Sequence, residues 1–79
     1  MLKPIATEKS VMKIEIENTL TFEVFRKSTK EEIRKEFEDM FKVKVEKVRT
    51  LIRGNKKYVY LKLKKEFPAM DIATKLGLM

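Results

Sequence analysis

Apolar and polar residues recur along the chain with two different periods, and each period predicts a type of element. Four apolar residues between positions 28 and 42 share one helical stripe: Ile33, Phe37, Met40 and Phe41. Thr29 and Glu32 precede that stripe at the spacing of a capping box, in which each side chain satisfies the backbone N–H of the other residue. Ser28–Lys42 is therefore predicted to be a helix whose apolar stripe enters the core.

Three other segments alternate apolar and polar residues, as strands with one buried face do. They are Thr19–Arg26, Val43–Arg53 and Lys56–Lys64. The last two are joined by Gly54-Asn55, a pair typical of a tight hairpin turn because it permits positive φ. In the first segment the alternation places Leu20, Phe22 and Val24 on one face, and Thr21, Glu23 and Phe25 on the other.

The N-terminal region carries weaker signals. Met1–Ile5 is predicted to be a short extended segment at a sheet edge, where its proline is tolerated. Thr7 can cap a helix that ends near Asn18. Ile14 and Ile16 would equally suit a strand, but a helix is the preferred interpretation.

Near the C-terminus, Pro68 can open a last short helix at its first position and Gly77 can close it. Its expected apolar contacts are Met70, Ile72, Ala73 and Leu76. The order strand–helix–strand–helix–strand–strand–helix predicts a single α+β domain over residues 1–79. We expect an antiparallel sheet of three long strands plus a short N-terminal edge strand, in a split β-α-β (ferredoxin-like) arrangement packed by helices. The second hairpin strand should pair with Thr19–Arg26.

The net charge of the chain indicates which classes of binding partner are expected. The 79 residues include 19 Lys and Arg against 12 Asp and Glu, a formal net charge of +7. Such an excess commonly neutralises phosphates in nucleic acid. Two alternatives remain open, a mixed surface that serves solubility and attraction to an anionic membrane, which usually shows a basic amphipathic helix.

Several functions are poorly supported. The chain has no His and no Cys, so it lacks the usual general base, thiol nucleophile and metal ligands, and it has no Gly-rich phosphate loop. We therefore expect no enzyme, no cofactor, no metal site and no small-molecule substrate. No apolar run is long enough for a membrane span, and Met1–Thr7 lacks the apolar stretch of a signal peptide, so we expect no direct membrane insertion and an intracellular protein.

The cations gather on one face of the predicted hairpin, because side chains two apart on a strand share a face. This face carries Lys47, Arg49 and Arg53 opposite Lys56, Tyr58, Tyr60, Lys62 and Lys64, with Lys57 beside them in the sequence. A second cluster, Arg26, Lys27 and Lys30, lies at the turn into the helix, and Lys9 lies near the N-terminus. Cations bind phosphate, and tyrosine rings can stack on unpaired bases. In the alternative interpretation, helices cover both faces and the tyrosines are packing residues.

Several fragments resemble the large-subunit ribosomal protein family numbered twenty-three, in its short archaeal form. Lys3-Pro4-Ile5-Ala6-Thr7-Glu8-Lys9-Ser10 is similar to the family's opening "P-x-x-[ST]-E-K", Ser28-Thr29-Lys30 to its "A-T-K", and Phe41–Val48 to its "F-x-V-K-V-x-x-V". Arg49-Thr50-Leu51 stands where "N-T-L" is usual, Lys57–Leu63 resembles the basic-aromatic last strand, and Asp71-Ile72-Ala73 with Leu76-Gly77 matches the archaeal C-terminus. The fragments are specific through their order and spacing.

The resemblance implies a cytoplasmic ribosomal protein that binds domain III of the large-subunit ribosomal RNA near the nascent-chain exit tunnel. It implies contact with a neighbouring small helical ribosomal protein, and transient docking of signal recognition particle and the protein-conducting channel. Glu8 matches a family position that contacts docking factors; alternatively, it only stabilises the start of a helix. The short turn at Gly54-Asn55 replaces the long hairpin extension of bacterial members, and Arg49 replaces the usual Asn.

Two further functions remain open. The chain could be an adaptor whose main partners are proteins and whose charge serves solubility. It could also be a free-standing regulator of messenger RNA. Salt dependence of RNA binding separates the adaptor from the RNA-binding hypothesis, since phosphate contacts weaken steeply with ionic strength.

Overall fold

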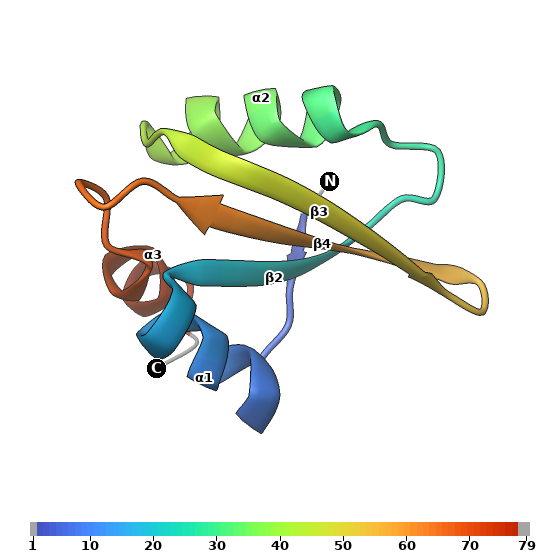
Figure 1. Cartoon of the computed structure of the whole chain (residues 1–79). Helices are drawn as coiled ribbons and strands as arrows, with labels where there is room; N and C mark the ends of the chain where they lie inside the picture. Colours follow the sequence, from blue (N-terminus) through green and yellow to red (C-terminus); the bar gives the residue numbers. More distant parts are fainter. Residues whose placement is uncertain (1, 78–79) are drawn as a thin grey trace.

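A computed structural model describes residues 2–77 as one antiparallel sheet with helices on both sides (Figure 1). The elements are β1 (Lys3–Pro4), α1 (Glu8–Glu17), β2 (Thr19–Val24), α2 (Lys30–Phe41), β3 (Val45–Arg53), β4 (Lys56–Leu63) and α3 (Ala69–Lys75). Their order and the α+β class agree with the sequence-based prediction. The helical interpretation of the segment after Thr7 is thereby confirmed over the strand alternative.

The sheet has the strand order β1-β2-β4-β3, and every neighbouring pair is antiparallel. The second hairpin strand, β4, lies between β2 and β3 as expected. Arg53 pairs with Lys56 across a two-residue turn, in which Gly54 has φ of 63°. A residue with a side chain would be strained at that φ, so glycine suits this position. The register shifts between Val45 and Lys47, which leaves Glu46 as the extra residue of β3.

Helix α2 covers one face of the sheet and closes the main core (Figure 1). Thr29 and Glu32 form the predicted capping box, and Ile33 and Phe37 are almost fully buried. The ring of Phe37 meets that of Phe22 edge to face, with 5.6 Å between centroids. Burying each such side chain stabilises the fold by about 1.5–3 kcal/mol.

One member of the predicted stripe is wrong. Met40 is 55% exposed, whereas Phe41 is partly buried against the core. Ile33, Phe37 and Phe41 follow one another at intervals of four residues and form the line that faces the sheet. Met40 belongs to the neighbouring row, which lies at the rim of a helix that packs on one side only.

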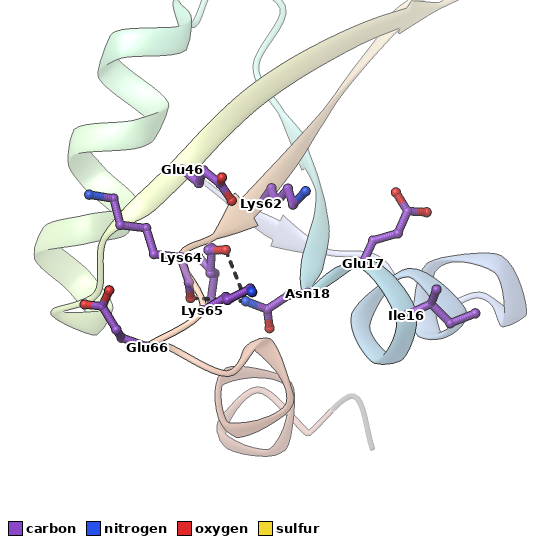
Figure 2. A pocket seen from close by; sticks show the side chains of 9 residues that line it. Ile16, Glu17, Asn18, Glu46, Lys62, Lys64, Lys65 and Glu66 are labelled. Atoms are coloured by element: carbon purple, nitrogen blue, oxygen red, sulfur yellow. Dashed lines mark hydrogen bonds between the residues drawn. The ribbon is translucent and has the colours of Figure 1, made fainter.

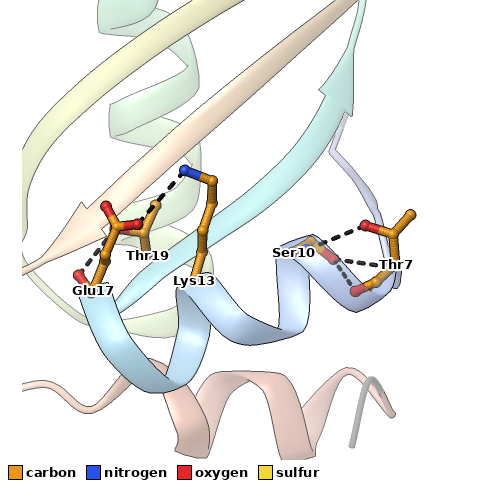
Figure 3. Close-up of polar contacts among 5 residues, drawn as sticks. All are labelled: Thr7, Ser10, Lys13, Glu17 and Thr19. Carbon is orange, nitrogen blue, oxygen red and sulfur yellow. Dashed lines mark hydrogen bonds and ion pairs between the residues drawn. The ribbon is translucent and has the colours of Figure 1, made fainter.

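Helices α1 and α3 lie on the opposite side of the sheet from α2 (Figure 1). Thr7 caps α1 as predicted, and its box partner is Ser10 (Figure 3). The Ser10 hydroxyl also donates to the carbonyl of Ile5. Ile14 is the buried apolar residue of α1, while Ile16 is 73% exposed. This side of the sheet is therefore covered by a thinner apolar layer than the α2 side.

Asn18 joins three elements. It ends α1 in the left-handed conformation, with φ of 52°, and its amide nitrogen donates to the carbonyls of Leu63 and Phe67 at 3.1 and 3.2 Å. Its amide oxygen accepts from the backbone N–H of Ala69 at 2.6 Å, at the start of α3. These bonds fix α3 beside α1 and the end of β4.

The element boundaries differ from the prediction by one or two residues. β2 ends at Val24 rather than Arg26, and β3 begins at Val45 because Lys42 ends α2 with φ of 54°. Pro68 is the N-cap of α3 rather than its first residue, and Gly77 follows its C-cap with φ of 75°. The expected contacts of α3 are met by Ile72, Ala73 and Leu76, but Ala69 is buried while Met70 is 38% exposed.

Candidate nucleic-acid interface

The outer face of the hairpin is the surface of β3 and β4 that points away from α2. Cross-strand pairs place on this face Lys47 opposite Lys62, Arg49 opposite Tyr60, Leu51 opposite Tyr58, and Arg53 opposite Lys56. The predicted grouping of five of the cations and both tyrosines on one face is therefore confirmed. Helix α1 packs on the neighbouring β2, where it buries Thr19 and Thr21, so most of the hairpin face stays open.

Two pairs of like charges lie directly across the hairpin, Lys47 with Lys62 and Arg53 with Lys56. Like charges in this position destabilise a sheet. The ion pairs that the structure describes within residues 2–77 join Lys13 to Glu17 and Arg34 to Glu38, both on helices, and do not offset this repulsion. A polyanion bound to this face would relieve it.

The two tyrosines are both partly buried. The ammonium of Lys13 on α1 lies 5.1 Å from the centre of the Tyr60 ring, at cation–π distance. Helix α1 thus packs beside Tyr60. At this edge of the face, the alternative interpretation of the tyrosines as packing residues therefore holds for Tyr60. Lys13 was not among the predicted RNA-binding residues, although its spacing of four from Lys9 on a helix was a signal that the two share a face.

Lys57 lies on the other side of β4 from the tyrosines. It pairs with Val24 and Ile52, and its ammonium donates to the carbonyl oxygen of Ser28 at 2.6 Å. Lys57 therefore belongs to the turn between β2 and α2 rather than to the outer face of the hairpin.

That turn carries the second predicted cluster. Arg26, Lys27 and Lys30 are all exposed, and the turn is closed by a hydrogen bond from the N–H of Ser28 to the carbonyl of Phe25. Phe25 is 66% exposed beside these cations. The cluster is separated along the sheet from Lys62 and Lys64, so the candidate residues form more than one patch.

The remaining predicted residues lie apart. Lys9 and Glu8 are exposed on the first turn of α1. Lys64 follows the end of β4 and lines a shallow hollow together with Glu17, Glu46, Lys62, Lys65 and Glu66 (Figure 2). Because carboxylates and ammonium groups are mixed there, this end of the outer face is a poorer site for an anion than the part toward Arg49 and Arg53.

Residues 2–77 contain no group of three or more side chains arranged to hold a metal ion. No helix within the same residues has the length and apolar character needed to cross a membrane.

The fold and the open cationic face define the class of the protein: it is a small basic α+β protein that presents an exposed cationic sheet surface. Comparison with known proteins then identifies the family. Residues 1–71 match the model of the family described as "Ribosomal protein L23". The chain is also 52% identical over 79 residues to "Large ribosomal subunit protein uL23" of Methanothermobacter thermautotrophicus, an alignment that covers 98% of this chain and 91% of that protein. The chain belongs to the ribosomal protein L23 family and is a structural protein of the ribosome, not an enzyme.

Proposed function

We propose that this protein is a component of the large ribosomal subunit in the cytoplasm, where it binds ribosomal RNA through the outer face of the hairpin. Family membership supports the assignment to the large subunit, since the archaeal relative carries that designation. The observation that supports the RNA-binding surface is the open strip of cations on β3 and β4 with its unneutralised like-charge pairs. Phosphates of a folded RNA would offset that repulsion.

The proposed footprint extends to the turn between β2 and α2. Arg26, Lys27 and Lys30 are exposed there, and Lys57 holds the turn against the hairpin through the Ser28 carbonyl. A turn held in this way loses less backbone freedom on binding, so the remaining loss falls mainly on its exposed side chains. We place Lys9 and Lys64 at the margin of the footprint.

Within the ribosome, the proposed location is domain III of the large-subunit RNA beside the exit of the nascent-chain tunnel. This location rests on the family resemblance. The same resemblance supports contact with a neighbouring small helical ribosomal protein and transient docking of signal recognition particle and the protein-conducting channel. Apolar side chains on α1 favour a protein-facing surface there, since Met12 and Ile16 are 52% and 73% exposed one turn apart, close to Glu8.

Binding of the purified protein to a transcript of domain III tests this function. The comparison is a scrambled RNA of equal length, at low and high salt. We expect tighter binding to domain III and a steep loss of affinity with salt. Equal binding of both RNAs would reduce the proposal to a general polycation, and no binding to either would favour the protein adaptor instead.

A further inference from the structure

A groove separates α1 from the hairpin on the outer side of the sheet. It has a volume of about 370 Å³, within the roughly 300–1,000 Å³ of pockets that hold small ligands. Tyr58 and Tyr60 of β4 form one wall, and α1 contributes Lys9 and Lys13 to the other. Arg53 lies at the hairpin end. None of the described residues that line the groove is acidic.

The two tyrosines differ in what already contacts their rings. The ammonium of Lys13 occupies the ring of Tyr60. The ring of Tyr58 has no aromatic or cationic partner among residues 2–77, and Leu51 is its cross-strand neighbour. Tyr58 therefore offers a ring that a planar group can stack on.

A buried polar atom lies at the base of the groove. Thr21 lines the groove from β2, pairs with Tyr60 and is only 7% exposed. Its hydroxyl oxygen is buried and has no hydrogen-bond partner in the described chain. Because this oxygen is closed off from the groove, Thr21 contributes to the floor of the groove and not a hydrogen bond to a ligand.

We propose that this groove holds one unpaired nucleotide of the bound RNA. The base stacks on the ring of Tyr58, and the adjoining phosphates lie between Lys9 and Arg53. A base combined with a phosphate matches the combination of ring and cations better than an acidic peptide, which offers no comparable planar group. The inference rests on the proposed RNA-binding function and adds that the recognised RNA contains an extruded nucleotide.

Two RNA hairpins test the groove. They share the same loop, and one carries a single unpaired adenosine in its stem while the stem of the other is fully paired. We expect the wild-type protein to bind the first roughly tenfold more tightly, since stacking of a base on an aromatic side chain contributes about 1–3 kcal/mol. Tyr58→Leu should abolish this preference and Tyr58→Phe should keep it.

Thermal melting followed by circular dichroism checks that each variant folds. A second measurement needs no variant: the ring protons of Tyr58 in the wild-type NMR spectrum should shift upfield with the hairpin that carries the unpaired adenosine, and not with the paired one.

The outcomes separate the two proposals. Equal, salt-sensitive binding of both hairpins by the wild-type protein would overturn the groove and leave the RNA-binding function standing. A preference that survives Tyr58→Leu, or Tyr58 ring protons that do not move, would overturn the groove in the same way. No binding to either hairpin or to domain III would overturn the RNA-binding function and the groove with it.

Discussion

The two faces of the sheet are covered by helices of similar length but differ in character. On the inner face, α2 inserts Ile33 and Phe37 into an apolar core with Phe22 and Leu61. On the outer face, α1 buries only Ser10 and Ile14 of its own residues, and the strand beneath it presents threonines. The inner face thus supplies most of the apolar stabilisation.

In this small protein, one face of the sheet supplies most of the stability and the other stays accessible for binding. The outer face leaves polar, cationic and aromatic side chains accessible because α1 reaches over β2 and not over β3. A functional surface can therefore carry repelling charges, because stability is provided on the other side of the same strands. Four predictions test this division.

The largest effect on stability is expected in the inner face. Phe37→Ala removes a fully buried ring that contacts Phe22 and Phe41, and should lower the free energy of unfolding by about 3–5 kcal/mol. Leu51→Ala on the outer face, where Leu51 is 38% exposed, should change it by well under about 2 kcal/mol. Urea unfolding measures both variants. Similar losses would contradict the division between a stabilising and a binding face.

The outer face should dominate binding. Replacing Lys47, Arg49 and Arg53 together by glutamate should abolish RNA binding at moderate salt without loss of fold, since these exposed side chains lie on one strand face. The corresponding alanine variant should lower the salt slope of the binding constant by about 0.9 for each phosphate that the protein no longer neutralises.

The matched control for that experiment changes the same number of charges elsewhere. Lys35, Lys44 and Lys65 are exposed and lie off the outer face of the hairpin. Their replacement by glutamate should weaken binding much less. Equal losses of affinity for the two triple variants would show that net charge, and not this face, determines binding.

Asn18 joins the layers on the outer side. Asn18→Ala removes the hydrogen bonds to Leu63, Phe67 and Ala69 and leaves a left-handed conformation that alanine disfavours. We expect the free energy of unfolding to fall by about 1–3 kcal/mol, the range for unpaired buried groups. Hydrogen exchange should show earlier opening of α3 than of α2. Asn55→Ala in the exposed hairpin turn is the control, and a comparable destabilisation there would argue against the role of Asn18.

The smallest effects are expected at the helix caps. Thr29→Ala should destabilise the protein by about 1 kcal/mol. Thr7→Ala removes the equivalent cap of α1, but the Ser10 hydroxyl keeps its bond to the Ile5 carbonyl. The melting temperature should fall by about 4–8 °C for each kcal/mol of destabilisation. The preference for an unpaired nucleotide should respond only to Thr7→Ala, because α1 borders the groove and α2 does not.

Local patterns in the sequence were sufficient to predict the secondary-structure elements and which side chains share a face of each element. The Thr29 and Glu32 box, the alternation in Thr19–Arg26 and the Gly54-Asn55 turn each depend on residues only a few positions apart. Spacing along a helix or strand determines which side chains share a face, so the cations and tyrosines of the hairpin could be grouped correctly. The residue roles in RNA binding stay predictions.

Tertiary structure alone decided what each face meets. Lys57 bonds the Ser28 carbonyl, 29 positions away in the chain, and Lys13 reaches the ring of Tyr60 from another element. The exposure of Met40 and the groove beside Tyr58 also depend on how helices and strands that are distant in the sequence pack against one another. The physical reason is that periodicity specifies directions relative to one element, whereas contacts between distant segments follow from how the packed elements share space.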